Sequence, residues 1–330
     1  MPKVSIVLPV FNAASSVGAS LDSILAQTMP DLEVICVNDG STDDTESCLE
    51  RYRKADSRVR CLSFRQNSKS VIARKRGVLD AVGDFIMFVD ADDLLMPDAC
   101  EKLLELMDRT HADVLQFALR LETEKTGGVN PAFENMFAVH DLSLAAPDIL
   151  PACFIRHRFS HNLWNKIYRG ELCRKAFAAM PDCRFFHYED MYALFFVLYH
   201  ASAFRSVPTD PLYLYRFRGI DSYADPTPAQ FEELCSAMRM FPILEDFLLD
   251  QNTLDRNRYV LDAMKDDIYQ DALTKILTVS DLDPDLIRIA YRFFGSDILF
   301  DFLKKIGLTQ VQATSRLGLI EQLAKNMLSC

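Results

Sequence analysis

The stretch Phe85-Ile86-Met87-Phe88-Val89-Asp90-Ala91-Asp92-Asp93 joins a continuous apolar run to three carboxylates. An uninterrupted apolar run of this length is typical of a strand that is buried on both faces, as in a parallel sheet covered by helices. The acids would then emerge together at the carboxyl edge of the sheet, where open α/β sheets bind their ligands. The stretch therefore predicts an α/β fold and the edge that holds its site.

The residues around this stretch alternate between apolar runs and segments with helical spacing. Such alternation predicts βα units, and hence a single Rossmann-like, mainly parallel sheet flanked by helices. The predicted strands are 4–9, 32–37, 59–64, 85–89, 113–118, 204–207 and 212–217, and the predicted helices are 17–27, 43–54, 71–81, 97–110, 148–158, 170–179 and 190–201.

Two regions are expected in a chain of 330 residues, because single hydrophobic cores stop growing near ~250 to 300 residues. Residues 1–222 carry the alternating pattern, and helical spacing dominates 223–330, with a polar, proline-containing linker at 221–228. Between residues 122 and 140 the pattern fades, which predicts a loop or a small hairpin.

The composition excludes several classes of protein. A net charge of −11 argues against binding of nucleic acid or an anionic membrane through bulk charge. The nine cysteines have no paired spacing, which indicates reduced thiols in a cytoplasmic protein. The amino terminus has no export-signal pattern, and the longest apolar run, 191–199, is about half of the ~20 residues that a membrane helix needs. We therefore expect a cytoplasmic protein without a transmembrane segment.

The three acids at the strand end favour a metal site. Mutual repulsion is relieved if a divalent cation binds them, and carboxylate oxygens suit Mg²⁺ or Mn²⁺, with a diphosphate as the other ligand. However, Asp also favours helix starts and turns, so these acids could cap the following segment. The acids alone leave both interpretations open.

Asp39 closes the strand 32–37 and would lie at the same edge. It could accept hydrogen bonds from a nucleotide base, whereas Ser41 or Thr42 after it suits the role of helix cap. By itself this pattern is weak evidence for nucleotide binding.

Charged residues at two helices add to the candidates. Arg74, within a cationic run, matches phosphate oxygens through bidentate hydrogen bonds, although such runs are commonly solvated faces. Glu189 and Asp190 begin an apolar helix, where the helix dipole favours acids. The alternative is that one of them is a general base.

Other catalytic classes find no support. The six histidines lack zinc-ligand spacing, and no serine lies in a nucleophile elbow. Neither the glycine-rich dinucleotide fingerprint nor the P-loop motif is present.

In their order and spacing, five segments of the first region resemble the family 2 glycosyltransferases, which have the A-type glycosyltransferase fold. Two further segments resemble acceptor-side motifs of bacterial capsule and cell-surface polysaccharide transferases, and the whole resemblance covers roughly residues 3–220. The matching segments are Val7-Leu8-Pro9-Val10-Phe11-Asn12, Asp22-Ser23-Ile24-Leu25-Ala26-Gln27-Thr28, Val37-Asn38-Asp39-Gly40-Ser41-Thr42-Asp43, Ala73-Arg74, Phe88-Val89-Asp90-Ala91-Asp92-Asp93, Trp164-Asn165-Lys166-Ile167-Tyr168 and Tyr188-Glu189-Asp190.

The resemblance implies a donor half at about 1–120 and an acceptor half at about 140–222. It implies that Asp92 is the direct ligand of Mn²⁺ or Mg²⁺, assisted by Asp90, which also lies near the ribose. It leaves the role of Asp93 open. The base would be Asp190, with Glu189 as the alternative. The implied nucleotide-binding residues are Pro9, Phe11, Asn12, Asp39, Arg74, Asp90 and Ala91.

The implied activity is an inverting transfer from a nucleotide sugar, with a UDP-sugar favoured, to a saccharide or lipid-linked saccharide. A lipid-linked acceptor would bring the enzyme to the inner face of the membrane without inserting it. A nucleotidyltransferase would share the sheet and the metal carboxylates, but should carry a glycine-rich basic loop after the first strand, and 9–14 is not one. A non-catalytic nucleotide-sugar binding protein would have lost acids that this chain keeps.

The chain departs from the family pattern at four places. Phe11 replaces the usual Tyr, and Lys75 replaces the usual Asn. The glycines common before the arginine are replaced by 67–70, and Tyr188 stands where Gly is commoner. We therefore expect a different loop near the donor sugar and altered access to the base.

Overall fold

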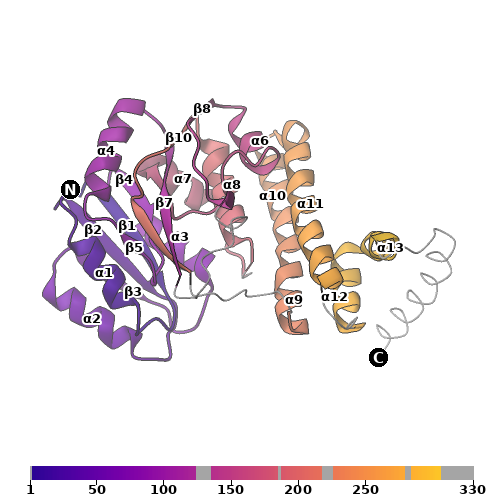
Figure 1. The fold of residues 1–330 in the computed structure, drawn as a ribbon, viewed down its shortest axis with the longest axis horizontal. Coiled ribbons are helices and arrows are strands. Elements are labelled where there is room, and N and C mark those ends of the chain that lie inside the picture. The colour runs from indigo at the N-terminus through magenta and orange to yellow at the C-terminus, as the bar shows by residue number, and fades with distance from the viewer. Residues whose placement is uncertain (1, 124–134, 185–186, 218–225, 279–283, 306–330) are drawn as a thin grey trace. The chain divides into compact units, whose positions relative to one another are not determined.

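The computed structural model describes residues 2–123, 135–184, 187–217, 226–278 and 284–305 (Figure 1). The chain divides into two compact units, the first formed by Met1–Arg184 and Glu189–Gly219 and the second by Phe185–Tyr188 and Ile220–Cys330. The predicted boundary at residue 222 and most of the predicted loop at 122–140 and linker at 221–228 lie outside the described residues.

The first unit contains the predicted mainly parallel sheet. Its eight strands lie in the order β3-β2-β1-β4-β9-β6-β10-β8, and the two strands β9 and β8 are antiparallel to their neighbours. The strands are β1 (Val4–Val10), β2 (Leu32–Asn38), β3 (Val59–Ser63), β4 (Phe85–Phe88), β6 (Val114–Phe117), β8 (Leu142–Ala145), β9 (Lys166–Arg169) and β10 (Ala203–Val207).

A second sheet of three strands was not expected from the sequence. It has the order β5-β11-β7, with β5 (Leu94–Leu95), β7 (Leu119–Thr123) and β11 (Tyr213–Phe217). β5 is too short to leave a pattern, and only Ala118 separates β7 from β6, so the two strands read as one run.

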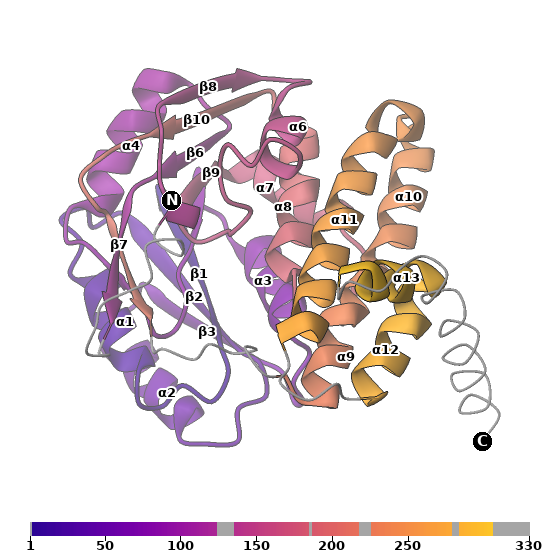
Figure 2. The same ribbon diagram turned by 45° about the vertical axis from the view of Figure 1, so that its right-hand side comes forward.

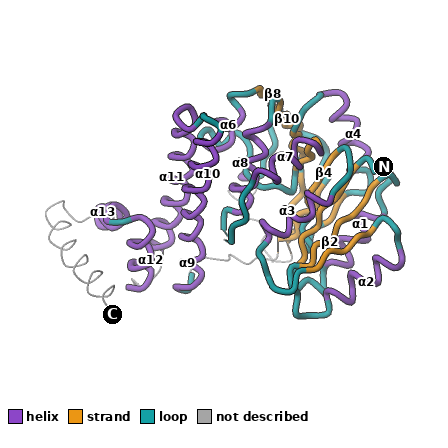
Figure 3. Tube along the Cα trace, turned by 180° about the vertical axis from the view of Figure 1, so that it is seen from behind, coloured by secondary structure: helices purple, strands orange, loops and turns teal. Residues whose placement is uncertain are grey.

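Helices cover both faces of the main sheet (Figures 2 and 3). On one face, Val4, Ile6 and Leu8 of β1 share a core with apolar residues of α1, α2 and α4. On the other face, Gly77 of α3 lies against Val7, so closely that an added Cβ would be 2.5 Å from a Val7 methyl. The helices of this unit are α1 (Val17–Leu25), α2 (Thr45–Ala55), α3 (Ser70–Asp80), α4 (Ala99–Thr110), α6 (Ile149–Phe154), α7 (Gly170–Ala179) and α8 (Glu189–His200).

One edge of the main sheet collects the chemistry-bearing residues. The parallel strands β1, β2, β4, β6 and β10 all end there, so that residues after Val10, Asn38, Phe88, Phe117 and Val207 lie along it. Because β9 and β8 run the other way, the residues before Lys166 and before Leu142 lie at this edge too.

The second unit is helical in its described residues, as the sequence predicted. Its helices α9, α11, α12 and α13 share an apolar core, and Thr227 with Gln230 forms a capping box at the start of α9. None of the described helices combines the length and the apolarity needed to cross a bilayer. The helices are α9 (Pro228–Ser236), η1 (Ala237–Arg239), α10 (Met240–Asp250), α11 (Leu254–Thr278), α12 (Pro284–Phe294) and α13 (Ser296–Lys305).

Candidate active site

Arg74 is the centre of the candidate site. Its guanidinium lies 3.1 Å from Asp90, 2.9 Å from Asp190 and 3.5 Å from Glu189. The arginine is only 5% exposed. Burial alone would lower its pKa, but the three carboxylates raise it, so the guanidinium remains charged. One buried cation therefore joins the acid at the end of β4 to both acids at the start of α8.

Asp190 is held from two sides. One of its oxygens pairs with Arg74, and the other accepts a hydrogen bond from the Leu163 backbone N–H at 3.1 Å. Glu189 beside it accepts a 3.4 Å hydrogen bond from the Ser70 hydroxyl. Burial, followed by the charge of Asp190, raises the pKa of Glu189 to about 7. Asp190 is thus held in position by two partners, whereas Glu189 changes its charge near neutral pH.

Asp93 is hydrogen-bonded to two residues of β11. Its carboxylate accepts a 2.7 Å hydrogen bond from the Tyr213 hydroxyl and a 2.8 Å bond from the Arg216 backbone N–H. The Tyr213 oxygen also accepts from the Asp90 backbone N–H at 3.2 Å. Burial, followed by the charge of Asp90, raises the pKa of Asp93 to about 8. Asp93 therefore ties β11 to the acidic turn.

The other two carboxylates of the acidic turn, those of Asp90 and Asp92, are the candidate ligands of a divalent cation. Asp90 is part-buried, and the charges of Asp190 and Asp92 follow burial among the causes that raise its pKa, while Arg74 opposes them. The described residues contain no group of three or more His, Cys, Asp or Glu that could hold a metal. Mg²⁺ commonly takes one or two carboxylates and completes its shell with substrate phosphates, so Asp90 and Asp92 fit such an ion.

The residues at the β1 and β2 ends form a neighbouring group. Phe11 is 47% exposed, which leaves its ring available for stacking on a base. Asn12 is tied to the next loop, because its side-chain oxygen accepts from the Thr42 N–H at 2.8 Å and its own N–H donates to the Ser41 hydroxyl at 3.0 Å. Pro9 pairs in register with Val37 of β2.

The loop 67–70 connects this group to the acids of α8. The Ser68 backbone N–H donates to Asp39 at 2.7 Å, while the Ser70 hydroxyl donates to Glu189. Asp39 is 3% exposed, and burial raises its pKa against the effect of the Ser68 hydrogen bond. The loop thus contacts both Asp39, which is predicted to bind the nucleotide base, and Glu189 of the predicted catalytic pair.

Two of the departures from glycine coincide with left-handed backbone. Lys69 has a φ of 75° and Tyr188 a φ of 60°, a region that side chains rarely occupy and that glycine adopts freely. Within the second unit, the Tyr188 hydroxyl donates to Asp271 at 3.0 Å. The chain therefore keeps a glycine-like backbone at both positions without the glycine.

Three aromatic residues lie at the same edge, of which only Trp164 was placed in an acceptor-side motif in the sequence analysis, while Phe137 and Tyr215 were given no role. The Trp164 ring stacks on Tyr215 with 5.0 Å between centroids and 5° between planes, and Phe137 lies 5.3 Å from Trp164. Burial raises the pKa of the Tyr215 hydroxyl, and so do the charges of Asp93, Asp90, Asp92 and Asp190. Tyr215 is therefore near enough to both acid groups to feel their charge. The alternation of Tyr213 and Tyr215 on one strand, with the chain's single tryptophan, was the available signal.

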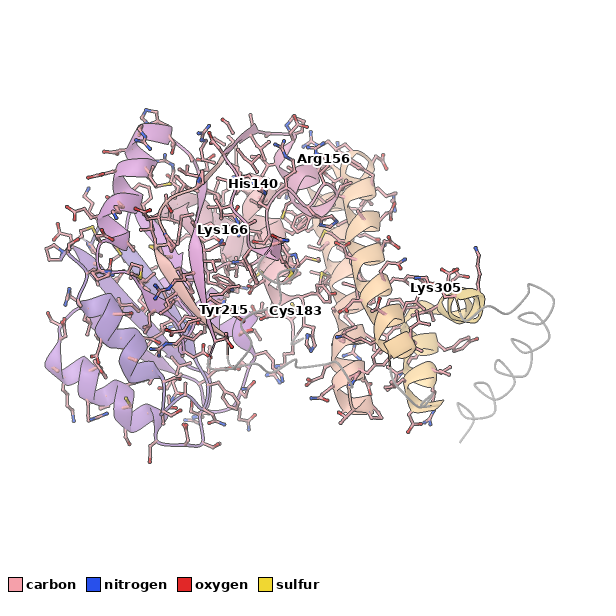
Figure 4. The ribbon with its side chains drawn as sticks, in the orientation of Figure 1. His140, Arg156, Lys166, Cys183, Tyr215 and Lys305 are labelled. Atoms are coloured by element: carbon pink, nitrogen blue, oxygen red, sulfur yellow. The ribbon has the colours of Figure 1, made fainter. Side chains whose placement is uncertain are left out.

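Lys166 supports the turn that precedes β9 and is fully buried (Figure 4). Its amine donates to the Asn162 carbonyl at 2.5 Å and to the Asn165 side chain at 3.1 Å. Burial lowers its pKa to about 7. The same turn presents the Leu163 N–H to Asp190 and the Trp164 ring to Tyr215.

Comparison with known proteins identifies the family. The sequence profile described as "Glycosyl transferase family 2" matches residues 5–195, which is more than half of the chain. The chain belongs to glycosyl transferase family 2. This family 2 chain is thus a glycosyltransferase enzyme, as the resemblance implied.

Two curated relatives of this family 2 glycosyltransferase come from Bacillus subtilis and Campylobacter jejuni. The "Putative glycosyltransferase EpsH" of Bacillus subtilis is 29% identical over 79% of this chain and 74% of the relative. The "GalNAc(5)-diNAcBac-PP-undecaprenol beta-1,3-glucosyltransferase" of Campylobacter jejuni is 31% identical over 48% of this chain and 51% of the relative. In the latter case the match spans about half of each protein.

Solved structures confirm the A-type fold of this glycosyltransferase. The S. aureus TarS 1-349 structure in complex with UDP has a TM-score of 0.57 and 18% identity, and covers 96% of this chain and 83% of TarS 1-349. The mannosyltransferase PcManGT of Pyrobaculum calidifontis, solved with GDP-Man and Mn²⁺, has a TM-score of 0.52 and 15% identity, and covers 98% of this chain and 80% of PcManGT.

The contrast between Asp93 and Asp92 predicts opposite mutational phenotypes. Asp93→Ala leaves the Arg216 N–H and the Tyr213 hydroxyl without their acceptor, and each such loss costs about 1–3 kcal/mol. We expect the free energy of unfolding to fall by about 2 kcal/mol or more in urea denaturation. Asp92→Ala should lower it by less than Asp93→Ala does, because Asp92 is half-buried whereas Asp93 is 1% exposed. Equal stability of the two variants would contradict the structural role of Asp93.

Proposed function

We propose that this enzyme transfers a sugar from a nucleoside diphosphate, with UDP favoured, to a hydroxyl of a saccharide or lipid-linked saccharide in cell-surface polysaccharide synthesis. The transfer is inverting and depends on Mn²⁺ or Mg²⁺. The observation that carries the proposal is the Arg74 bridge, because it brings the acid of the metal motif and the candidate base to one guanidinium.

The properties of similar proteins support the choice of substrates. TarS has been solved with UDP and with UDP-GlcNAc. The name of the Campylobacter relative describes a glucosyltransferase that acts on an undecaprenol-linked saccharide. For this chain we propose the same classes of donor and acceptor. A lipid-linked acceptor would place the enzyme at the inner face of the cytoplasmic membrane.

In the proposed donor site, Phe11 stacks on the base and Asp39 accepts a hydrogen bond from it, while Pro9, Asn12 and Ala91 shape the surrounding backbone. Asn12 acts by holding the two loops together through Ser41 and Thr42.

Asp90 and Asp92 would hold the divalent cation, which stabilises negative charge on the departing diphosphate when it is bound. Arg74 keeps Asp90 oriented and limits repulsion among the acids. The metal would thus act on the diphosphate, whereas the guanidinium acts on the acids of the site.

Asp190 is the proposed base. It takes the proton of the acceptor hydroxyl as that oxygen attacks the anomeric carbon from the face opposite the leaving group, which inverts the configuration. The Leu163 N–H and Arg74 fix its carboxylate. Glu189 adds negative charge next to Asp190 once it ionises, which favours proton uptake by Asp190.

Product analysis tests this function. Incubation of the full chain with a panel of nucleotide sugars and Mn²⁺ should release a nucleoside diphosphate from at least one donor. The same donor should raise the melting temperature, because a ligand that binds only the folded state stabilises it. Release of pyrophosphate from a nucleoside triphosphate and a sugar phosphate would instead identify a nucleotidyltransferase. Binding of a donor without any release would identify a non-catalytic binding protein.

The pKa of Glu189 predicts the pH dependence of the transfer. Since this pKa is raised to about 7, Glu189 is neutral below that pH and ionised above it. We expect kcat/KM to rise as the pH increases through about 7, because ionised Glu189 strengthens Asp190 as a base. In Glu189→Gln the rise near pH 7 should disappear. A wild-type profile that is flat across neutral pH would contradict the role of Glu189.

A further inference from the structure

A cavity of about 470 Å³ lies beyond the aromatic residues at the same edge of the main sheet. It is lined by the start of β7 at 118–121, by 137–139 and by Pro208 and Thr209. These segments follow β6, precede β8 and follow β10, so the strand register places all of them at the edge that carries the acids. The volume falls within the range of about 300–1,000 Å³ that is typical of ligand pockets.

Phe137 joins this cavity to the active site. Its ring lines the cavity and also packs on Trp164 and Tyr215, with centroids 5.3 and 5.9 Å away. Tyr215 in turn lies within the electrostatic influence of Asp92 and Asp190. The geometric link to the proposed base is the turn at 163–164, because the Leu163 N–H bonds Asp190 and the next residue, Trp164, packs on Phe137.

The chemistry of the lining suits a sugar. Phe137 and Pro208 offer apolar surface for the C–H faces of a pyranose, whereas Thr209 and the exposed Arg120 offer polar groups for its hydroxyls. Ligand sites commonly combine an apolar wall with a few placed polar groups.

We propose that this cavity is a second acceptor subsite, which binds the sugar residue that precedes the one receiving the transferred sugar. This inference rests on the proposed function. It implies that the acceptor is an oligosaccharide of at least two residues. The terminal residue lies at Asp190 against the Trp164–Tyr215 stack, and the preceding residue passes Phe137 into the cavity.

The test compares the binding of saccharides of increasing length to the full chain. The probes are a panel of monosaccharides and of defined di- and trisaccharides that end in them, titrated by ligand-observed NMR. For at least one series, the disaccharide should bind about 10-fold more tightly than its terminal monosaccharide, equivalent to about 1.4 kcal/mol.

Two variants address the cavity and two serve as matched controls. Ala138→Trp fills the cavity from an exposed lining position, and Arg120→Ala removes its guanidinium; both should abolish the gain with length. Ala55→Trp on α2 and Arg109→Ala on α4, also exposed positions, should retain it. All four variants should release nucleoside diphosphate from the donor at the wild-type rate when no acceptor is added.

The inference is overturned if affinity does not increase beyond the monosaccharide in any series, or if the increase survives both cavity variants. Failure of the proposed function has a different signature, because then the wild-type chain releases no nucleoside diphosphate from any nucleotide sugar. Binding of polyprenyl phosphate vesicles in place of every saccharide would assign the cavity to a lipid and also contradict the inference.

Discussion

Replacing Asp190 by Asn is expected to lower kcat of sugar transfer by about 10²- to 10⁴-fold, which is the usual contribution of a positioned general base. The amide cannot accept the proton of the acceptor hydroxyl. It also removes one of the negative charges on Arg74, to which the carboxylate is paired at 2.9 Å. The measurement is initial-rate kinetics with the donor identified by the nucleotide-sugar panel.

Three comparisons separate loss of the base from loss of the fold. Asp108→Asn, an exposed substitution of the same kind on α4, should retain the wild-type rate. The Asp190→Asn variant should still bind UDP in the presence of Mn²⁺ and keep the wild-type circular dichroism spectrum. If Asp190→Asn keeps the full rate while Glu189→Gln loses it, the two acids have exchanged roles. If both variants keep the full rate, the base lies elsewhere.

The second large effect is expected at the metal. Removal of divalent cations with EDTA should reduce transfer by about 10²-fold or more, because Lewis-acid stabilisation of the leaving group contributes several kcal/mol. Added Mn²⁺ should restore the rate. Asp92→Asn should have a comparable effect that Mn²⁺ does not restore, since a neutral amide is a weaker ligand than a carboxylate.

Calorimetric titration of UDP with and without Mn²⁺ supplies the direct check. In the wild type, Mn²⁺ should increase the affinity for UDP, and in Asp92→Asn this increase should be lost. An affinity that does not depend on Mn²⁺ in the wild type would show that Asp90 and Asp92 do not hold a catalytic cation.

The main elements of the sheet were predictable because their residues carry strong local signals. β4 is apolar throughout, β1 and β2 are apolar except for Ser5, Glu33 and Asn38, and the acids follow β4 after Val89. β9 has only four residues and begins with a charged lysine that is fully buried. The fold brings Asn162 and Asn165 to that lysine as hydrogen-bond partners. Neither the strand propensity of these residues nor a hydrophobic period therefore reveals β9 in the sequence.

The contacts of the candidate site were predictable only in part. Arg74 was expected at the phosphates, and the structure shows that its guanidinium pairs with Glu189 and Asp190, which lie more than a hundred positions further along the chain. The structural role of Asp93 depends on β11, which pairs with β5 although the two strands also lie more than a hundred positions apart in the sequence. Local sequence patterns contain no information on such distant pairings. From the sequence alone, a carboxylate that anchors a strand cannot be distinguished from one that binds a metal.

The antiparallel strand β9 separates the two parallel parts of the main sheet, since β4 and β6 each pair with β9 and not with each other. Homologous recombination could therefore exchange one part without breaking a parallel strand pair. The left-handed residue His111, at the end of α4, is a natural crossover point. If the proposed donor and acceptor halves are right, chimaeras that join residues 1–110 of this chain to the remainder of a relative should combine the nucleotide preference of one parent with the acceptor preference of the other. The topology would then allow donor and acceptor preferences to be exchanged separately.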